Sequence, residues 1–356
     1  MITINMLSRA DSIKGQGVLS AHDEQVELLK KEWSNEFSIY ENKLKLCNIM
    51  HYHTINPDFF IGLPFAKCKG ITVGYVHFLP ETLEDSIHIP ELFKKIFYKY
   101  VISFYKSMDY LVTVNPYFID RLEHYGINRN KVTYIPNFVS EEQFYKKEDK
   151  KEIRKKYQLK ESDFVVLGVG QLQVRKGIFD FIKTAEAMPN VKFLWAGDFA
   201  FGKISNGYEE IKKIVSNPPE NVKFLGLIDR EEMNNIYNMA DVMFLPSYEE
   251  LFPMTVLEAM NCGLPILLRD VDIYKNILFD FYLKGKDVQD FASILDKVKN
   301  DTKYRQKAEK SSFRGHLYYS RKHVSQMWKE FYMGIFEHEK ATKKEWSLQN
   351  ILFKKI

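Results

Sequence analysis

Two glutamates separated by seven residues, Glu250 and Glu258, stand in the stretch LPSYEELFPMTVLEAMNCGLPILL. Pro253 lies between them, and its fixed φ and missing N–H suit the first position of a helix. The predicted helix ends near Asn261, because Gly263 can adopt the left-handed conformation that closes a helix. Carboxylates accept hydrogen bonds from hydroxyl groups. The segment therefore predicts a binding site for a hydroxylated ligand.

The start of this helix is a predicted anion site. The first backbone N–H groups, near Met254 and Thr255, have no partner inside a helix, and the helix dipole favours negative charge there. Glu258 follows within one helical turn and shares a face with them. We predict that its carboxylate accepts hydrogen bonds from the ribose hydroxyls of a nucleotide. The alternative, a solvated glutamate on an ordinary amphipathic helix, stays open at this point.

A second candidate phosphate site is the segment GQLQVRKG, which begins at Gly170. It follows the apolar run Phe164–Val169, a predicted strand, and leads into a predicted helix from Gly177 to Met188. Arg175 can fork onto a phosphate, and Lys176 can add a point charge. The spacing differs from a Walker A loop, which needs G-K-[ST] after its spacer. A plain surface pair of cations is the alternative.

The elements that position these groups alternate between strands and helices. Val242–Leu245, the predicted helix and Pro265–Leu268 form a βαβ unit, whose strands are parallel. The N-terminal half repeats the pattern, with predicted strands at Ile2–Leu7 and Ile71–His77. The chain is therefore predicted to be an α/β protein. His77 ends its strand at the edge where open α/β sheets place ligand-contacting residues, although a capped surface histidine is the alternative.

A glycine-containing loop follows the first predicted strand. It carries Gly15, Gln16 and Gly17 before a predicted helix over Val18–Trp33. Glycines at a strand-to-helix turn let the backbone approach a ligand closely. A lone G-x-G is a weak signal, for which a simple tight turn is the default interpretation.

Composition restricts the class of protein. The chain has 356 residues, of which 45% are apolar and 15% aromatic, enough for two domains with separate cores. Its net charge of +4 is too small for a dedicated nucleic-acid binder. The 3 cysteines are scattered without metal-ligand spacing, which predicts reduced cytosolic thiols and no metal site. No signal peptide or spanning apolar run is present, so we expect a cytoplasmic protein that is soluble or peripheral.

Basic charge collects in two places. Residues 303–356 contain 13 Lys/Arg and 5 Asp/Glu, a net +8 that leaves −4 for the remainder. The segment Leu92–Met108 is predicted to be a helix with an aromatic stripe and lysines mostly outside it. Such a helix can lie in a membrane interface, and it can equally pack its stripe on the sheet. The candidate membrane contacts are Phe93, Lys94, Lys95, Phe97 and Lys99.

The composite pattern resembles the family 4 retaining glycosyltransferases. Glu250 and Glu258 match the EX7E motif of that family, and EAMNCGLP matches its EAM-x-x-G-x-P. The family commonly has E-G-F-G at the first glutamate, where this chain has ELFP, so the spacing is kept but the loop is stiffer. GQLQVRKG resembles the family's G-R-L-x-x-x-K-G, with Gln171 in place of the first arginine. IPNFVSEEQF resembles the IPNGVD segment that leads out of the first domain. The charged stretch KKEDKKEIRKKYQLKESD that follows it predicts an interdomain linker with a short surface helix.

This resemblance implies the GT-B architecture, in which two doubly wound Rossmann-like domains face a central cleft. We predict an acceptor-binding domain over residues 1–145 and a nucleotide-sugar domain over residues 146–323. A C-terminal helix within residues 324–356 is expected to pack back on the first domain. The resemblance also implies a UDP-hexose donor, no cofactor or metal, and retention of the anomeric configuration.

The resemblance assigns roles to the residues of the second domain. Arg175 and Lys176 would neutralise the charge on the departing UDP, together with the start of the helix at Met254. Glu258 would hold the ribose. Glu250 would contact the donor sugar, either by binding its hydroxyls or by stabilising the oxocarbenium-like centre. Backbone contacts at the segment FLG, which contains Leu225, would hold the base.

In the first domain, the resemblance makes His77 a sugar-positioning residue and puts the loop of Gly15, Gln16 and Gly17 against the donor phosphate or the acceptor. The segments DSIKGQGVLSAHDEQVELLKK and VHFLPETL resemble bacterial diacylglycerol glycolipid synthases, especially those that add a second hexose to a monoglycosyl-diacylglycerol. This implies a glycolipid acceptor and an anionic surface at the inner face of the cell membrane.

Three other functions stay open on the sequence. A transferase of the same family with a cell-wall, capsule or teichoic-acid acceptor would share every donor motif. A glycoside hydrolase would use two carboxylates across one bond, for which a helix-borne Glu258 is poorly placed. A nucleotide-sugar binding protein without catalysis would keep the basic pair and tolerate loss of Glu250. The sequence does not decide whether the transferred sugar is glucose or galactose, nor which linkage is formed.

Overall fold

The computed structural model of the chain describes residues 1–9, 17–80, 91–199, 207–250 and 252–353, with the backbone alone described at 17–21, 91–93 and 343–353. The chain divides into two compact units. The first consists of Met1–Phe138 with Arg321–Ile356, and the second of Val139–Ser320.

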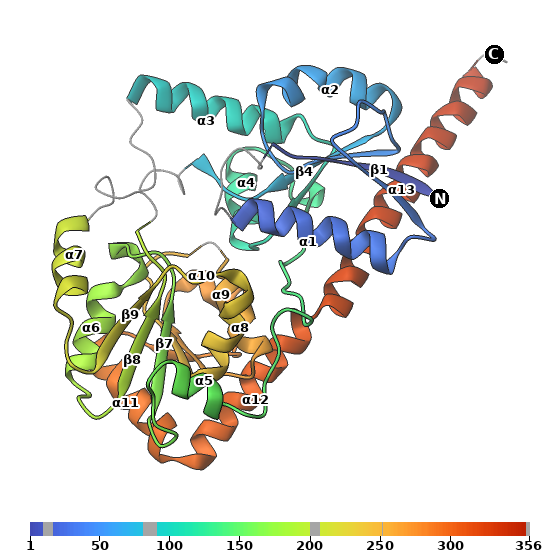
Figure 1. The fold of residues 1–356 in the computed structure, drawn as a ribbon. Coiled ribbons are helices and arrows are strands. Elements are labelled where there is room, and N and C mark those ends of the chain that lie inside the picture. The colour runs from blue at the N-terminus through green and yellow to red at the C-terminus, as the bar shows by residue number, and fades with distance from the viewer. Residues whose placement is uncertain (10–16, 81–90, 200–206, 251, 354–356) are drawn as a thin grey trace. The chain divides into compact units, whose positions relative to one another are not determined.

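The first unit is built on a six-stranded parallel sheet in the order β2-β1-β3-β4-β5-β6. Helices cover the sheet, and the last helix of the chain returns to it (Figure 1). The strands are β1 Ile2–Leu7, β2 Phe37–Glu41, β3 Ile49–Tyr52, β4 Ile71–Val76, β5 Tyr110–Thr113 and β6 Val132–Tyr134. The helices are α1 Gly17–Glu32, α2 Pro57–Lys69, α3 Glu91–Lys106, α4 Tyr117–His124 and α13 Arg321–Phe353.

The second unit is built on another six-stranded parallel sheet, in the order β12-β11-β10-β7-β8-β9. Its strands are β7 Val165–Val169, β8 Lys192–Ala196, β9 Val222–Gly226, β10 Val242–Leu245, β11 Ile266–Arg269 and β12 Leu283–Gly285. Its helices are α5 Lys151–Lys156, α6 Ile178–Glu186, α7 Tyr208–Ser216, α8 Arg230–Met239, α9 Met254–Asn261, α10 Asp272–Lys275, α11 Val288–Asn300 and α12 Thr302–Tyr318.

Both sheets are doubly wound, which confirms the predicted α/β class with two Rossmann-like domains. In the second unit the strand order reverses between β7 and β10, and in the first it reverses between β1 and β3. The loops that follow the two strands at such a point diverge to opposite faces and leave a crevice in which open α/β sheets bind ligands. In the second unit these loops are the segments after Val169 and after Leu245.

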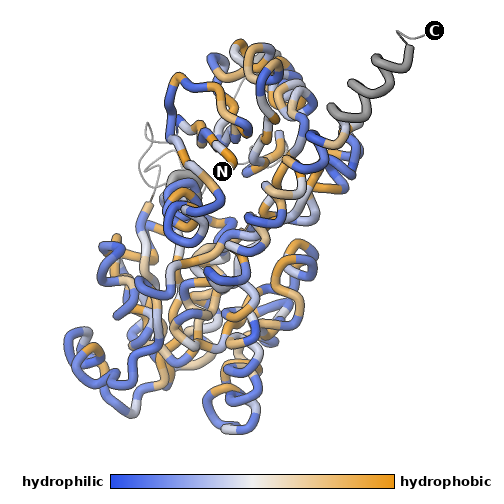
Figure 2. Tube along the Cα trace, turned by 90° about the vertical axis from the view of Figure 1, so that its right-hand side faces the viewer, coloured by the Kyte–Doolittle hydropathy of each residue, from blue (hydrophilic) through white to orange (hydrophobic). Residues whose placement is uncertain are grey.

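The central strands β7 and β10 of the second unit are apolar along their whole length, as expected of parallel strands that are covered on both faces. Every residue of β7 and of β10 is buried. Figure 2 shows the hydropathy of each residue along the chain, and the buried core of the second unit includes most residues of β7, β10 and β11. Trp195 is fully buried among Phe181 and Phe193, and its indole N–H donates to the carbonyl of Gly170 at 2.9 Å. The packed interior is thereby joined to the loop after β7.

The predicted domain boundary at residue 145 lies inside the second unit. The backbone N–H of Tyr145 donates to Asn234 Oδ1 at 3.1 Å, and that of Lys147 donates to Asn238 Oδ1 at 2.7 Å. Arg154, predicted to belong to a surface linker helix, is 5% exposed and pairs with Asp241 at 2.7 Å. The charged stretch is therefore docked on α8 and β10 and is not a free linker, because asparagine amides and a carboxylate supply its partners.

The last helix belongs to the first unit through polar contacts along α13. The hydroxyl of Tyr332 accepts a hydrogen bond from Gln25 Nε2 at 3.1 Å, and Trp33 Nε1 donates to the carbonyl of Ser325 at 3.2 Å. Lys329 pairs with Glu36 at 2.9 Å. Among the helices that the structure describes, none combines the length and the apolar character needed to cross a bilayer.

Candidate active site

The end of the loop after β7 contacts the first residues of the loop after β10, because these two strands lie side by side in the sheet. Gly177 has φ +75°, and a Cβ there would lie 2.1 Å from the carbonyl oxygen of Pro246, so only glycine fits. The backbone N–H of Tyr248 donates to the carbonyl of Arg175 at 2.8 Å. The basic segment and the segment before Glu250 are therefore joined by their backbones.

Lys176 and Glu250, both predicted site residues, form an ion pair across these loops. Ser247 Oγ donates a second hydrogen bond to Oε1 of Glu250 at 2.9 Å. The side chains of Lys176 and Glu250 are only 13% and 7% exposed. A lysine ammonium has three N–H donors, so Lys176 can keep this pair and still bind a phosphate oxygen.

Arg175 lies beside this pair in a short 3-10 turn over Val174–Lys176. Its Nε donates to Gln173 Oε1 at 2.8 Å, which directs the guanidinium group without neutralising it. Four further N–H donors remain on the guanidinium group, and its fork matches the geometry of a phosphate. The orienting role of Gln173 was not predicted from the sequence.

Glu258 is buried in α9 and held by two residues of α8. Tyr237 donates its hydroxyl to Oε2 at 2.6 Å, and Arg230 donates from Nη1 to Oε1 at 3.0 Å. Burial raises the pKa of Glu258, against the opposing effects of Tyr237 and Arg230. At 5% exposure it is not a solvated surface glutamate, so that alternative is wrong. Each oxygen can still accept a ligand hydroxyl, because a carboxylate oxygen accepts two hydrogen bonds.

Sequence reasoning missed Tyr237 and Arg230. They are seven residues apart on α8 and therefore share one face of the helix. That spacing was the available signal, but only the contact between α8 and α9 shows which face meets Glu258.

The start of α9 lies one residue later than predicted. Pro253 precedes the helix as its N-cap, with φ −80° and ψ 96°, and Met254 is the first helical residue. The cause is the extended ψ of Pro253, which keeps it outside the helix. No side chain among the described residues caps this end, so no cap occupies the first N–H groups, those of Met254 and Thr255, where an anion could bind.

The two remaining predicted donor residues lie at the same edge of the sheet. Gly170 follows β7 with φ +155° and donates its N–H to the carbonyl of Ala196 at 3.0 Å. Leu225 is half-buried near the end of β9, one residue before Gly226. The carboxyl ends of β7, β9 and β10 therefore carry the predicted donor residues along one edge of the second unit, which is the arrangement that a nucleotide site in a doubly wound sheet requires.

His77, in the first unit, follows β4 and belongs to a cluster of four histidines with His22, His51 and His53. The ring of His53 lies 4.4 Å from that of His51, 4.7 Å from that of His22 and 6.1 Å from that of His77, centre to centre. Burial lowers the pKa of His77 to about 3 and those of His51 and His53 well below the ordinary value. The rings of His51, His53 and His77 are therefore neutral at pH 7. Sequence reasoning did not predict the cluster, because its members come from α1, from β3 and from the residues directly after β3 and β4.

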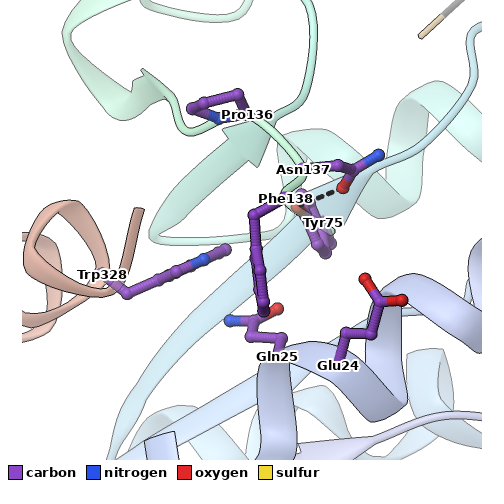
Figure 3. A pocket seen from close by; sticks show the side chains of 7 residues that line it. All are labelled: Glu24, Gln25, Tyr75, Pro136, Asn137, Phe138 and Trp328. Carbon is purple, nitrogen blue, oxygen red and sulfur yellow. Dashed lines mark hydrogen bonds between the residues drawn. The ribbon is translucent and has the colours of Figure 1, made fainter. Parts of the chain in front are cut away.

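A small hollow beside this cluster is lined by aromatic and amide side chains (Figure 3). The hydroxyl of Tyr75 donates to Asn137 Oδ1 at 3.5 Å across it, and Gln25 and Trp328 lie at its side. Its volume is about 10 Å³, which suits one water molecule and not a sugar. The hollow is therefore part of the packing between α1, α13 and the sheet.

Some of the residues predicted to contact the substrates or the membrane lie outside the described residues or have no described side chain. Gly15 and Gln16 lie outside the described residues, Gly17 begins α1, and the side chain of Phe93 is not described. On α3, Lys95 and Lys99 are exposed, whereas Lys94 and Phe97 are half-buried. Among the described residues, no group of three or more His, Cys, Asp or Glu side chains is arranged to hold a metal ion.

The geometry defines a class of protein. Two doubly wound domains, the second with cations, helix N–H groups and a buried glutamate at its strand ends, are the architecture of GT-B enzymes that use nucleotide sugars. HepE from Anabaena, solved in complex with UDP-glucose, has this fold with a TM-score of 0.72 at 16% identity, over 94% of this chain and 100% of HepE.

Two family models match the chain, that for Glycosyl transferases group 1 over residues 149–314 and that for Glycosyltransferase Family 4 over residues 41–143. The alpha-galactosylglucosyldiacylglycerol synthase of Streptococcus pneumoniae is 43% identical over 334 residues, 93% of this chain and 89% of the relative. The processive diacylglycerol alpha-glucosyltransferase of Acholeplasma laidlawii is 34% identical over 57% of this chain and 61% of the relative. The chain therefore belongs to glycosyltransferase family 4 and is a glycosyltransferase.

Proposed function

We propose that this protein transfers glucose or galactose from a UDP-sugar to a monoglycosyl-diacylglycerol, forming a diglycosyl-diacylglycerol with retention of the anomeric configuration. The observation that carries the proposal is the 43% identity to a galactosylglucosyldiacylglycerol synthase over 93% of the chain. The match spans both units, so it includes the half that is expected to bind the acceptor. The second unit supplies groups suited to the donor.

In the proposed reaction, the cations of the loop after β7 act on the leaving group. Negative charge develops on the UDP as the bond to the sugar breaks, and preorganised donors that face this charge lower the barrier. Lys176 and Arg175 supply such donors, and the start of α9 at Met254 adds backbone N–H groups. Glu258 orients the nucleotide by accepting hydrogen bonds from the ribose.

Glu250 acts on the donor sugar. Lys176 and Ser247 hold one oxygen of its carboxylate, which leaves the other, Oε2, for a sugar hydroxyl or for the oxocarbenium-like centre. His77 contributes a neutral imidazole, since its pKa of about 3 keeps it uncharged at pH 7. It therefore acts on a sugar hydroxyl as a hydrogen-bond partner and not as a cation.

The proposed acceptor lies in a membrane, and α3 with α2 supports peripheral binding to an anionic inner leaflet. Lys95 and Lys99 are exposed on α3, where Ile96 is 59% exposed. On α2, Ile61 and Phe65 are 74% and 71% exposed. The two helices touch, because the rings of Phe60 and Tyr100 lie 5.7 Å apart. Exposed apolar and basic side chains on neighbouring helices suit a bilayer interface.

Replacing Lys94, Lys95 and Lys99 together by alanine is expected to weaken binding to vesicles rich in anionic lipid about 100-fold, since each lysine near such a surface contributes about 1 kcal/mol. Sedimentation with vesicles at several salt concentrations measures this. The matched control replaces three exposed lysines of the second unit, Lys151, Lys155 and Lys160. Equal loss in both triple variants would contradict a role for α3.

Replacing Glu258 by glutamine is expected to weaken UDP binding about tenfold, since a charge-assisted hydrogen bond to the ribose becomes a neutral one. Calorimetric titration with UDP and with uracil measures the change. UDP affinity should fall and uracil affinity should not. If the variant binds UDP as tightly as the wild type, Glu258 does not bind the ribose.

The experiment that tests the function uses the purified protein with UDP-glucose or UDP-galactose and anionic vesicles, with or without monoglucosyl-diacylglycerol. UDP release with a diglycosyl lipid product, only when the glycolipid is present, is the expected result. UDP binding without lipid product would replace the acceptor by a cell-wall, capsule or teichoic-acid precursor. Absence of UDP binding would overturn the donor assignment.

A further inference from the structure

A polar cluster, largely buried at Asp180 and Arg269 and 48% exposed at Tyr248, lies next to the Lys176–Glu250 pair in the second unit. It consists of Asp180 in the first turn of α6, Tyr248 in the loop after β10 and Arg269 at the end of β11. Oδ2 of Asp180 accepts a hydrogen bond from the hydroxyl of Tyr248 at 2.7 Å and pairs with Nη2 of Arg269. The side chains of Asp180 and Arg269 are 14% and 11% exposed, so their charges are largely desolvated.

Arg269 binds both ends of the short segment that precedes Glu250. Its Nε donates to the carbonyl of Pro246 at 3.1 Å, and its guanidinium carbon lies 4.0 Å from the ring centre of Tyr248, a cation–π contact. Its Nη1 donates to the carbonyl of Lys286 at 2.8 Å, which ties the same guanidinium group to the end of the neighbouring strand. The segment from Pro246 to Tyr248 is therefore fixed against the sheet.

This segment is linked to both predicted donor groups. Its middle residue, Ser247, donates to Glu250 at 2.9 Å. The backbone N–H of Tyr248 donates to the carbonyl of Arg175 at 2.8 Å. A displacement of Tyr248 would therefore move Glu250 and the basic loop at the same time.

Stability alone is a poor reason for this arrangement. A buried ion pair gains little over apolar packing, because desolvation of the two charges offsets their attraction. Asp180 and Arg269 are placed at the edge of the sheet that carries the candidate active site, and three of the contacts described above end on the Pro246–Tyr248 segment. Functional side chains need such supporting contacts to keep a productive geometry.

We propose that Asp180, Tyr248 and Arg269 are positioning residues that hold Glu250 at a fixed spacing from the Arg175/Lys176 loop. The proposal rests on the proposed function, because it assumes that Glu250 acts on the donor sugar. In this proposal, none of the three residues contacts the substrate.

Tyr248→Phe tests the proposal, because it deletes one hydroxyl and keeps the ring under Arg269. We expect kcat to fall about tenfold, the loss of one charge-assisted hydrogen bond, with KM for the UDP-hexose within about twofold. Tyr282→Phe is the matched control, since that hydroxyl is buried in the same unit and has no hydrogen bond to the described residues. The control should leave kcat unchanged, and an unchanged kcat in Tyr248→Phe would overturn the proposal.

A double-mutant cycle separates positioning from general stability. If Tyr248 acts through Glu250, Tyr248→Phe should have less than about a twofold effect in the Glu250→Gln background. An equal tenfold loss in both backgrounds would overturn the proposal, because a structural defect acts independently of Glu250. Asp180→Asn, which keeps the shape of the carboxyl group, provides a second cycle if Tyr248→Phe does not fold. Absence of transfer by the wild type would instead refute the proposed function.

Discussion

Glu250→Gln is expected to lower kcat for hexose transfer about 100- to 1,000-fold, with UDP affinity within about threefold of the wild type. The substitution keeps the size of the side chain and an oxygen that can accept from Ser247. It removes the negative charge that faces Lys176 and, in the proposed reaction, the developing positive charge on the sugar. Because Glu258 and the start of α9 are unchanged, the nucleotide should still bind. Steady-state UDP release and calorimetric titration with UDP measure the two quantities.

Glu249→Gln is the matched control for this prediction. Glu249 is the preceding residue and carries the same charge, but it is exposed, whereas Glu250 is 8% exposed. The control should retain the activity of the wild type. Comparable activity in both variants would show that the carboxylate of Glu250 has no part in the transfer. Loss of UDP binding in Glu250→Gln would show that this residue supports nucleotide binding.

Acidification from pH 7 to pH 5 is expected to reduce the free energy of unfolding of the first unit by several kcal/mol. Burial lowers the pKa of His51, His53 and His77, to about 3 for His77, whereas an unfolded histidine titrates at 6.5. Between the folded and unfolded values the unfolded chain binds more protons, so stability is full above pH 6.5 and is lost as the pH falls towards 3. Each histidine that stays neutral in the folded state contributes about 2 kcal/mol to the loss between pH 7 and pH 5.

Urea unfolding of the full chain at pH 7 and pH 5, followed by tryptophan fluorescence, measures this dependence. His53→Phe removes the central ring of the cluster from the titration and should reduce the loss by about 2 kcal/mol. His124→Asn, at an exposed position on α4, should leave it unchanged. A pH dependence that is the same in His53→Phe as in the wild type would show that the buried histidines do not cause it.

Patterns within short stretches of the sequence were sufficient to predict the class of fold and the positions of the motifs. Apolar runs such as Val165–Val169 and Val242–Leu245 lie in strands because parallel strands covered on both faces must be apolar throughout. Glycines and helix spacing then placed the basic pair and the two glutamates after those strands. These features depend on neighbours within a few residues, so they can be read without the fold.

The domain boundary could not be predicted in this way. Charge and low apolar content suggested a linker after residue 145, yet Tyr145 and Lys147 are docked on the asparagines of α8. Those amides lie about 90 residues further along the chain. Composition reports how soluble a segment is, and not which distant groups pair with its backbone.

By itself, the sequence determined two Rossmann-like domains, the Arg175/Lys176 pair and the two glutamates of the EX7E motif. Only the tertiary structure decided which residues hold them: Lys176 and Ser247 on Glu250, Tyr237 and Arg230 on Glu258, and the cluster of Asp180, Tyr248 and Arg269. The physical reason is that β7 and β10 pair side by side in the sheet, which brings together the ends of loops separated by some 70 residues of sequence. Contacts that depend on which strands are neighbours in the sheet produce no periodic pattern in the sequence, so the sequence alone does not reveal them.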